Sequence, residues 1–524
     1  MSAVFSKYYN YLFLISIIFY NLFPKKLRPI YLLLFSLLFF YLISSNLVIC
    51  IITTVVLIYL FALLLDKIEN EKNEALKKEN VDKKEIKRKY NSKKKAALII
   101  GIIVNVIFLF IFKYLKFFTI NINYLLDIFN VNYEISILKL IAPIGISFYT
   151  LQALSYLFDV YNGVTKAEKN IFKVGLFICF FPTIMEGPIV RYNDTAEALY
   201  EGKKITYASL TLGLQRIMWG LFKKIIIADR LNVLVKTVFN HYADYGSIIV
   251  FLGALAYTIM LYMDFSGAMD VVIGIGEIFN IKIPENFNQP FFSKNISEFW
   301  TRWHISLGKW FKDYIYYPIS LTKKLKKLTL KLRKLIGNKY GPLISGTIAL
   351  FVVWFLNGLW HGAGWTFLLF GMYHFVLISL GNITKPIFND LYTKLNIQNS
   401  KILKVLQIIK TTFLVIIGEL IFRATSVTDA FKMIKIMFTN VEVSKNQFLS
   451  LGLDFPDVLV LIVALTIIFA VGLLRERKVD IRKWIMGKNI IVRWLIYYAL
   501  IFAIIIFGAY GPGYQPVDPL YADF

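Results

Sequence analysis

The chain has 524 residues, of which 57% are hydrophobic and 18% charged, and its 59 Lys and Arg against 33 Asp and Glu give a formal net charge of +26. The hydrophobic share exceeds the roughly 45–50% that is usual in soluble domains, so composition excludes an ordinary soluble protein. The basic residues collect in short segments between apolar runs, which is typical of the positive-inside rule for membrane proteins and does not indicate nucleic-acid binding.

Several apolar runs reach or approach the length of about 20 residues that a helix needs to cross the hydrocarbon core of a bilayer. In chain order they are Tyr31–Ser45, Leu47–Leu65, Ala96–Phe112, Ile248–Met263, Gly341–Leu356, Val458–Leu474 and Ile490–Phe507. Backbone groups in lipid must find their hydrogen-bond partners within the segment, so these runs are predicted to be helices. We expect an all-α polytopic membrane protein with about 10–12 transmembrane helices.

Basic segments between the apolar runs predict the orientation of the chain. They are Lys25–Arg28, Lys67–Lys95, Lys323–Lys339 and Arg475–Lys483, and the positive-inside rule places them in the cytoplasm. The first apolar run, Tyr8–Phe23, lacks the basic start and the cleavage site of a signal peptide, so a retained helix with an extracytoplasmic N-terminus is predicted. The last run then places the C-terminus outside as well. Heavy use of Lys, Ile and Asn suggests a bacterial source and therefore a bacterial cell membrane.

The domain organisation is predicted to be simple, because no stretch has the composition of a soluble domain. Residues 1–524 are expected to form one integral membrane domain, with residues 66–95 and 323–339 as cytoplasmic basic loops, the first partly helical. Within residues 143–374, apolar runs are interrupted by Pro, Gly and charge, as in Ile184–Pro188 and Met263–Gly267. Broken helices at membrane depth occur where they are buried or line a cavity, so this part is predicted to be an irregular, polar-lined core.

Three acidic residues, Asp264, Asp270 and Glu277, lie in the otherwise apolar stretch Met263–Ile283. Intramembrane acids are candidates for function, and these could line an ion path. The alternative is that they pair with donors on a neighbouring helix. The inverted halves that are typical of a secondary transporter are not apparent in this sequence, although the sequence symmetry of such halves can be very weak.

Two of the four histidines are candidates for chemistry. His361 lies between apolar runs with Gly358, Gly362 and Gly364 around it, where a neutral imidazole can act as a general base. The alternative is a helix-end histidine bonded to a nearby carbonyl. His304 lies in the aromatic and basic stretch Phe299–Tyr314, which predicts either a cavity wall near the reaction centre or an amphipathic interfacial helix.

The remaining reactive side chains predict no further site. His241 is expected at the surface and His374 as a packing residue, while Cys50 and Cys179 sit in apolar runs as small buried side chains. No HExxH or His/Cys cluster is present, so no metal ligands are predicted. A GxSxG nucleophile elbow is absent too.

Four blocks of sequence resemble the motifs of the membrane-bound O-acyltransferase (MBOAT) family. The resemblance is to the bacterial branch that contains alginate O-acetylase and the teichoic acid D-alanyl transfer protein. In chain order the blocks are Pro143–Tyr149, Phe180–Tyr192, Phe299–Tyr314 and Asn357–Trp365. Thr301 and Lys312 stand where the family often has Arg, and Glu186 before Gly187 is not expected from the family pattern.

This resemblance implies a fold, an activity and a set of site residues. The MBOAT fold surrounds an irregular central funnel, and His361 matches the family's essential histidine, with His304 as the second motif histidine. The substrate channel is expected to include Trp303, Trp360, Asn357, Arg302 and Asp313. No bound cofactor is expected, because the acyl thioester, acetyl-CoA or an acyl carrier protein, is a substrate. The partners implied are the lipid bilayer, an extracytoplasmic acyltransferase and a possible cytoplasmic acyl carrier.

The activity that the resemblance implies is acyl transfer, most simply acetyl transfer, to a hydroxyl of an extracellular polysaccharide or peptidoglycan. His361 would be the general base, in a site dry enough to suppress hydrolysis of the thioester. D-alanyl transfer to teichoic acid is the alternative within the family; the extra C-terminal helix of this longer chain favours acetyl transfer. Two readings from other classes remain open: a secondary transporter that uses Asp264 and Glu277, and a scaffold for a cell-surface complex.

Overall fold

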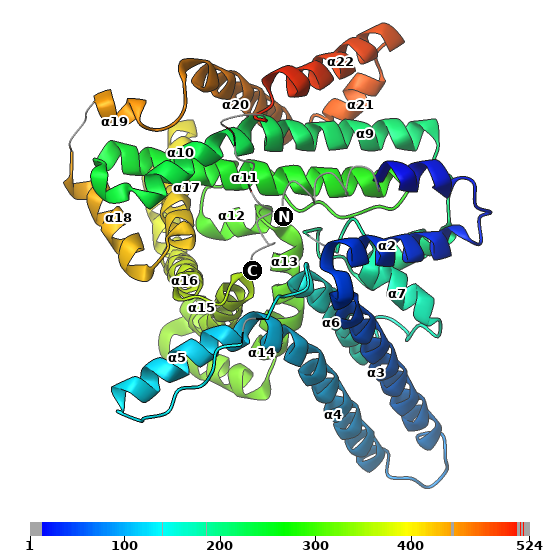
Figure 1. Cartoon of the computed structure of the whole chain (residues 1–524). Coiled ribbons are helices and arrows are strands. Elements are labelled where there is room, and N and C mark those ends of the chain that lie inside the picture. Colours follow the sequence, from blue (N-terminus) through cyan, green and yellow to red (C-terminus); the bar gives the residue numbers. More distant parts are fainter. Residues whose placement is uncertain are drawn as a thin grey trace. The chain divides into compact units, whose positions relative to one another are not determined.

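The structure is a computed structural model that describes residues 13–510, 514 and 517, except residues 139, 185 and 442–444. No β-strand occurs in these ranges, and eight helices there are long and apolar enough to span a membrane, which confirms the all-α polytopic class (Figure 1). The run Tyr8–Phe23, which was predicted to be a further helix, lies partly outside the described residues; residues 13–20 are helical.

The described residues group into two compact units. Unit 1 lies within Met1–Gly213 and Ile275–Pro284, and unit 2 within Leu214–Gly274 and Glu285–Leu520, so that the boundary falls inside helices α9 and α11. The Pro143–Tyr149 and Phe180–Tyr192 blocks belong to unit 1, whereas both histidine-containing blocks belong to unit 2.

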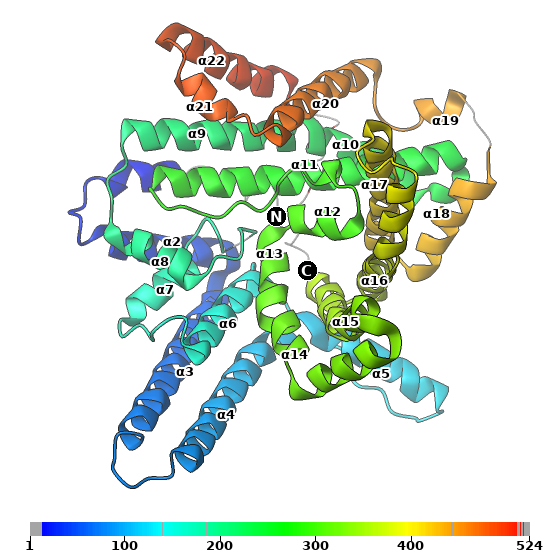
Figure 2. The same cartoon turned by 180° about the vertical axis from the view of Figure 1, so that it is seen from behind.

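Unit 1 is built on long helices with an apolar core. Its elements are α2 (Arg28–Ser44), η1 (Ser45–Leu47), α3 (Val48–Ala75), α4 (Lys83–Leu109), the π-helix η2 (Phe110–Tyr114), α5 (Leu115–Ile128), α6 (Ile146–Asn162), α7 (Ile171–Cys179) and α8 (Tyr192–Glu201). Helices α3 and α4 run side by side along most of their length in both views (Figures 1 and 2). A Cβ on Gly101 of α4 would lie 2.9 Å from Leu157 Cδ2 of α6, so this glycine permits the close approach of the two helices.

Unit 2 contains long helices together with several short ones, among them the two that carry the His304 block. After α9 (Tyr207–Leu221) come the π-helix η3 (Phe222–Ala228), α10 (Asp229–Asn240), η4 (Tyr242–Asp244), α11 (Ser247–Ile278) and η5 (Pro290–Phe292). The short helices α12 (Ile296–Arg302) and α13 (Ile305–Phe311) lead into the π-helix η6 (Lys312–Tyr316) and α14 (Tyr317–Ser320). The remaining helices are α15 (Lys323–His361), α16 (Trp365–Lys394), α17 (Lys401–Arg423), α18 (Val427–Thr439), α19 (Lys445–Leu449), α20 (Phe455–Glu476), α21 (Ile481–Met486) and α22 (Ile490–Phe507).

Both basic segments that were predicted as loops are largely helical. Helix α3 continues to Ala75, and α4 begins at Lys83, where the Asp82 carboxylate accepts a hydrogen bond of 2.8 Å from Lys84 N. Residues 323–339 form the first part of α15, with a kink at Gly337, whose φ is +85°. Lys, Leu and Glu are good helix formers, so charge alone did not distinguish a loop from a solvated helix.

Of the two predicted helix breaks, one is confirmed and one is wrong. Residues 181–184 and 186–191 are non-helical, and a Cβ on Gly187 would lie 2.4 Å from Thr183 Cα, so this turn requires glycine. Met263–Gly267, by contrast, lies inside the continuous helix α11. Here Lys224 Nζ lies 2.6 Å from an Asp264 carboxylate oxygen, so the acid is accommodated by an ion pair and does not break the helix.

Helices α15 and α16 are in backbone contact through two glycines. A Cβ on Gly358 would lie 2.6 Å from Phe367 O, and one on Gly371 would lie 2.4 Å from Trp354 O. Both distances are shorter than any normal van der Waals contact, and because the atoms met are backbone oxygens, the helices would have to separate.

Replacing Gly358 with alanine is therefore expected to lower the free energy of unfolding by about 1–3 kcal/mol. The thermal unfolding midpoint of the purified protein in detergent measures this change. Gly381→Ala in α16 is the matched control, because nothing lies within 4 Å of its added Cβ, and it should leave the midpoint unchanged or slightly higher. Equal midpoints for the two variants would contradict the close packing of α15 on α16.

Candidate functional site

His304 lies at a sharp turn between α12 and α13. Its backbone has φ 46° and ψ 52°, in the left-handed region that is uncommon for any residue other than glycine. The preceding segment holds this turn from both sides: Ile305 N donates to Asn286 O at 3.0 Å, and Asn288 N donates to Arg302 O at 2.9 Å. The turn re-aims the chain so that the His304 side chain is buried, with 3% of its surface exposed.

Asn286 sets the orientation of the His304 imidazole. The Asn286 Oδ1 atom lies 3.3 Å from His304 Nδ1 and accepts hydrogen bonds from Ser306 N at 3.0 Å and Ser306 Oγ at 2.9 Å. Because an amide oxygen only accepts, we assign the proton to Nδ1, which leaves Nε2 as an acceptor. Nε2 is buried and has no hydrogen-bond partner among the residues that the structure describes.

The His304 imidazole is neutral. It lies outside the eight candidate membrane spans, and burial lowers its pKa to about 3, since desolvation disfavours the imidazolium. A neutral imidazole with a free acceptor nitrogen can receive a hydrogen bond from a hydroxyl or accept its proton.

The two motif histidines both contact one tryptophan ring. The Trp360 ring is 5.6 Å from the His304 ring and 5.0 Å from the His361 ring, measured between centroids. Phe265 of α11 packs edge-on against His304, with 4.9 Å between the ring centroids. The structure thus brings together three of the residues predicted for the site, His304, Trp360 and His361, within unit 2.

His361 is the last residue of α15 and is 6% exposed. Its ring lies edge-on to Phe422 of α17 at 5.2 Å and to Phe370 of α16 at 5.8 Å, so its surroundings are mainly aromatic. A Cβ on the next residue, Gly362, would lie 2.2 Å from the Phe367 ring, so a larger residue would displace the helix end that presents His361.

Asn357 lies one helical turn before His361 on the same face of α15. It is 7% exposed, and its Oδ1 atom has no hydrogen-bond partner within the part of the chain that the structure describes. An unsatisfied buried amide costs stability and is a candidate for binding substrate.

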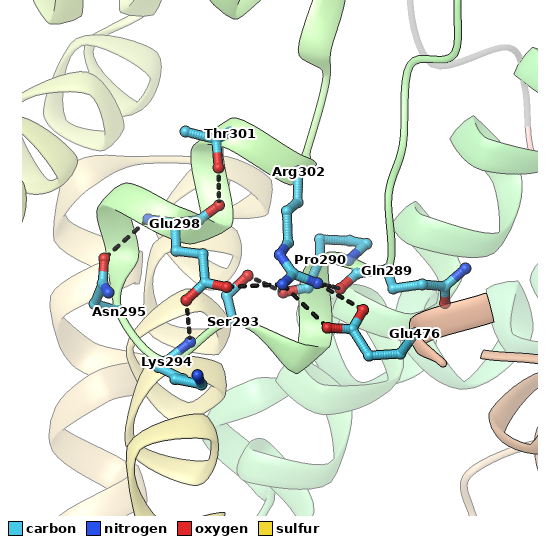
Figure 3. Close-up of polar contacts among 9 residues, drawn as sticks. All are labelled: Gln289, Pro290, Ser293, Lys294, Asn295, Glu298, Thr301, Arg302 and Glu476. Atoms are coloured by element: carbon cyan, nitrogen blue, oxygen red, sulfur yellow. Dashed lines mark hydrogen bonds and ion pairs between the residues drawn. The ribbon is translucent and has the colours of Figure 1, made fainter. Parts of the chain in front are cut away.

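Three other predicted channel residues lie in different surroundings. Trp303 is packed among aromatic rings, with Phe299 stacked at 5.4 Å and Phe287 at 5.1 Å. Arg302 forms ion pairs at 2.8 Å with Glu298 of its own helix and with Glu476 of α20 (Figure 3). Asp313 is exposed in η6. Arg302 therefore links α12 to α20, and no contact joins it to either histidine.

The other two histidines are placed as expected. His374 accepts a hydrogen bond of 3.2 Å from Trp300 Nε1 and packs against the Phe370 ring at 4.7 Å. The His241 side chain is 65% exposed. Among the described residues, no group of three or more His, Cys, Asp or Glu side chains is close enough to hold a metal ion.

Two of the intramembrane acids are paired with cations of the preceding helices. Asp270 lies 2.5 Å from Arg216 Nε and 2.6 Å from Lys223 Nζ, and Asp264 lies 2.6 Å from Lys224 Nζ. Arg216 also binds the exposed Glu285 carboxylate at 2.6 Å. These contacts match the alternative in which the acids serve as structural partners, and they hold α9 and η3 against α11.

Asn286 was not identified from the sequence, although it contacts both His304 and Ser306. Replacing it with alanine should free the imidazole to rotate and leave the Ser306 amide without its acceptor. If His304 takes part in the reaction, we expect acyl transfer to fall about tenfold or more, within the range for a group that orients another. Asn288→Ala is the control, because only its backbone nitrogen supports the turn. The rate of acyl transfer in isolated membranes measures the effect, and an Asn286→Ala rate equal to that of the control would argue against a role for the imidazole orientation.

Comparison with known proteins finds similarity over the region that contains His304. Residues 166–332 match the family model of the membrane-bound O-acyltransferase family, so the match includes the His304 block and ends before His361. The chain is 35% identical over 347 residues to a probable alginate O-acetylase of Pseudomonas aeruginosa, which covers 65% of this chain and 60% of that protein.

Two other groups of relatives align as well. A peptidoglycan O-acetyltransferase of Helicobacter pylori is 34% identical over 316 residues, 55% of this chain and 56% of the relative. A teichoic acid D-alanyltransferase of Bacillus subtilis is 34% identical over 251 residues, 47% of this chain and 60% of the relative. The chain thus spans about 60% of the length of the curated relatives it matches. These matches confirm the resemblance that the four motif blocks indicated.

Proposed function

We propose that this multi-pass membrane protein is an acyltransferase that acts on a polymer of the cell envelope. The proposal draws on the match of residues 166–332 to the membrane-bound O-acyltransferase family model. The group transferred is most simply acetyl, and its final acceptor is a hydroxyl of an extracytoplasmic polysaccharide or of peptidoglycan. The observation that carries the proposal is the contact of both His304 and His361, from the two motif blocks in unit 2, with the same Trp360 ring.

His361 is the proposed general base. It takes the proton of the acceptor hydroxyl as the oxygen attacks the thioester carbonyl; a C–O bond forms, the C–S bond breaks, and the proton passes to the departing thiolate. General-base catalysis of this kind contributes about 10²–10⁴ in rate. The aromatic surroundings of His361 exclude water, which protects the thioester from hydrolysis.

His304 and Asn357 are proposed to position the reactants. The acceptor nitrogen of His304 is suited to receive a hydrogen bond from a hydroxyl, and the Asn357 Oδ1 atom, on the same helix face as His361, is suited to accept one from a substrate donor. Trp360 contacts both imidazoles and is proposed to provide an apolar wall for the acyl group.

The donor, the partners and the orientation follow as further parts of the proposal. The donor is a cytoplasmic thioester, acetyl-CoA or an acyl carrier protein, and the basic helical segments 66–95 and 323–339 attract its phosphates electrostatically. An extracytoplasmic acyltransferase receives the acyl group and completes transfer to the polymer. The chain lies in a bacterial inner membrane with an extracytoplasmic N-terminus.

D-alanyl transfer to teichoic acid is a second candidate, favoured by the similarity to the Bacillus subtilis D-alanyltransferase. A secondary transporter fits less well, because Asp264 and Asp270 are in close ion pairs with Lys224, Lys223 and Arg216. An ion path needs carboxylates that can exchange partners, and releasing these would leave buried cations uncompensated.

The proposal is tested by comparing the envelope polymers of a strain that lacks the chain with those of the same strain complemented by it. Mild alkali releases ester-linked groups, and chromatography distinguishes acetate from D-alanine. Acetate that depends on the chain, in the polysaccharide or peptidoglycan fraction, supports acetyl transfer; D-alanine in the teichoic acid fraction supports the second candidate. Identical ester content in both strains would contradict acyltransferase function.

A further inference from the structure

A basic pocket of about 650 Å³ lies in unit 1, between the residues that lead into α2 and the segment that follows α8. Its lining includes four cationic residues, Lys25, Arg28, Lys203 and Lys204, and no acidic one. The motif blocks do not contribute to it, and the proposed acyl transfer does not use it.

The walls of the pocket are held by specific contacts. Arg28 is 4% exposed, and its guanidinium donates to Phe23 O at 3.0 Å and to Gly202 O at 2.8 Å. The Asn21 side chain exchanges two hydrogen bonds of 2.9 Å with the backbone of Ile205. Gly202 has φ +61°, and a Cβ there would lie 2.4 Å from Lys25 O, so the two walls are in backbone contact. The cavity is therefore built into the fold.

The electrostatics of the pocket favour an anion. Helix α2 begins at Arg28 and has no acidic residue in its first turn, so the positive end of its dipole adds to the four cations. The Glu201 carboxylate pairs with Lys203 at 2.9 Å, and the Glu201 side chain is 39% exposed. One such exposed pair neutralises little of the total charge.

The apolar rim of the pocket consists of Leu22, which lines it, and of Leu27 and Ile30, which lie within two residues of Arg28 in the chain. Helix α2 starts the candidate span Arg28–Ala75, so the pocket lies where a span begins. Leu22 is 72% exposed, Leu27 45% and Ile30 44% beside the cationic residues. Phosphate bound by the cations would leave attached acyl chains against these exposed side chains.

We infer that this pocket binds an anionic phospholipid, with its headgroup phosphate held by Lys25, Arg28, Lys203 and Lys204 and its acyl chains along Leu22, Leu27 and Ile30. The basic residues mark the leaflet as the cytoplasmic one, whose anionic lipids attract such clusters. A soluble phosphate compound would use the cations and leave the apolar rim uncovered. A phospholipid would contact both the cations, through its phosphate, and the apolar rim, through its acyl chains.

The test is a titration of the purified, delipidated protein in detergent with phosphatidylglycerol, followed by native mass spectrometry. The variant combines Lys25→Gln, Lys203→Gln and Lys204→Gln and leaves Arg28, which supports the wall, in place. The control combines Lys401→Gln, Lys432→Gln and Lys435→Gln, which removes the same charge from exposed positions of α17 and α18. Lys204→Glu serves as a second pocket variant, and unfolding midpoints confirm that every protein is folded.

The expected result is a loss of phosphatidylglycerol affinity of about tenfold or more in the pocket variants, with the control close to wild type. Phosphatidylcholine should bind more weakly than phosphatidylglycerol to the wild type and be unaffected by the substitutions. Equal affinities in pocket and control variants would overturn the inference. Displacement of the lipid by inorganic pyrophosphate at low concentration would overturn the lipid assignment and indicate a soluble phosphate ligand.

Discussion

Replacing His361 with alanine is expected to reduce the rate of acyl transfer by about 10²–10⁴, which is the contribution of a general base. The physical reason is that a hydroxyl is a poor nucleophile until a base accepts its proton. The neighbouring rings, Trp360, Phe370 and Phe422, carry no group that could replace the imidazole in this step. The rate is measured as transfer of labelled acyl groups from the thioester in isolated membranes.

The His361→Ala experiment needs controls for folding and for the loss of a histidine as such. The removed side chain is buried against aromatic rings, so a cavity could lower stability, and the unfolding midpoint must be compared with that of the wild type. His361→Asn keeps polarity without a usable base and should be as inactive as alanine. His241→Ala, at an exposed position, should retain full activity. An active His361→Asn variant would show that the position supports structure and does not accept the proton.

Asp270→Ala is expected to lower the free energy of unfolding by about 3–5 kcal/mol. The Asp270 side chain is 4% exposed and pairs with Arg216 and Lys223, whose side chains are 6% and 8% exposed. Truncation leaves two cations in a low-dielectric interior, and although Glu285 still compensates Arg216, Lys223 loses its carboxylate. The midpoint of thermal unfolding in detergent, or the yield of folded protein in membranes, measures the loss.

Asp390→Ala is the matched control for Asp270→Ala. Asp390 also pairs with a lysine, Lys339, at 3.0 Å, but its side chain is 66% exposed, so solvent screens the pair and its loss should cost roughly 0–1 kcal/mol. A further comparison is the double variant Asp270→Ala and Lys223→Met, which removes the uncompensated ammonium and should recover part of the stability. Similar midpoints for Asp270→Ala and the surface control would contradict the structural role of this cluster.

The sequence was a good guide to the spanning helices and to the two motif histidines. Runs such as Val458–Leu474 and Ile490–Phe507 correspond closely to α20 and α22, because a helix in lipid is specified by length and hydrophobicity alone. The order of the motif blocks along the chain also related His304 to His361, although only the structure showed that both rings contact Trp360.

What could not be predicted depends on partners distant in sequence. The stretch Met263–Gly267, which contains Asp264, was expected to break the helix. That Lys224 reaches Asp264 and Lys223 reaches Asp270 follows only from the packing of η3 on α11. The role of Asn286 depends on the turn at His304, whose positive φ has no signal in a single sequence. Arg302 was predicted for the channel because of its place in the motif. Its actual partner, Glu476, lies 174 residues away in the chain, so nothing in the sequence indicated this ion pair.

The central claim, that His361 carries acyl transfer to an envelope polymer, is tested most directly by the ester content of that polymer in a strain complemented with wild type or with His361→Ala. Equal amounts of folded protein must first be confirmed in the membranes. We predict that the mutant strain loses the acetyl or D-alanyl esters that the wild type restores. Unchanged ester content with a folded His361→Ala protein would contradict the claim. It would favour the alternative functions, a secondary transporter or a scaffold for a cell-surface complex.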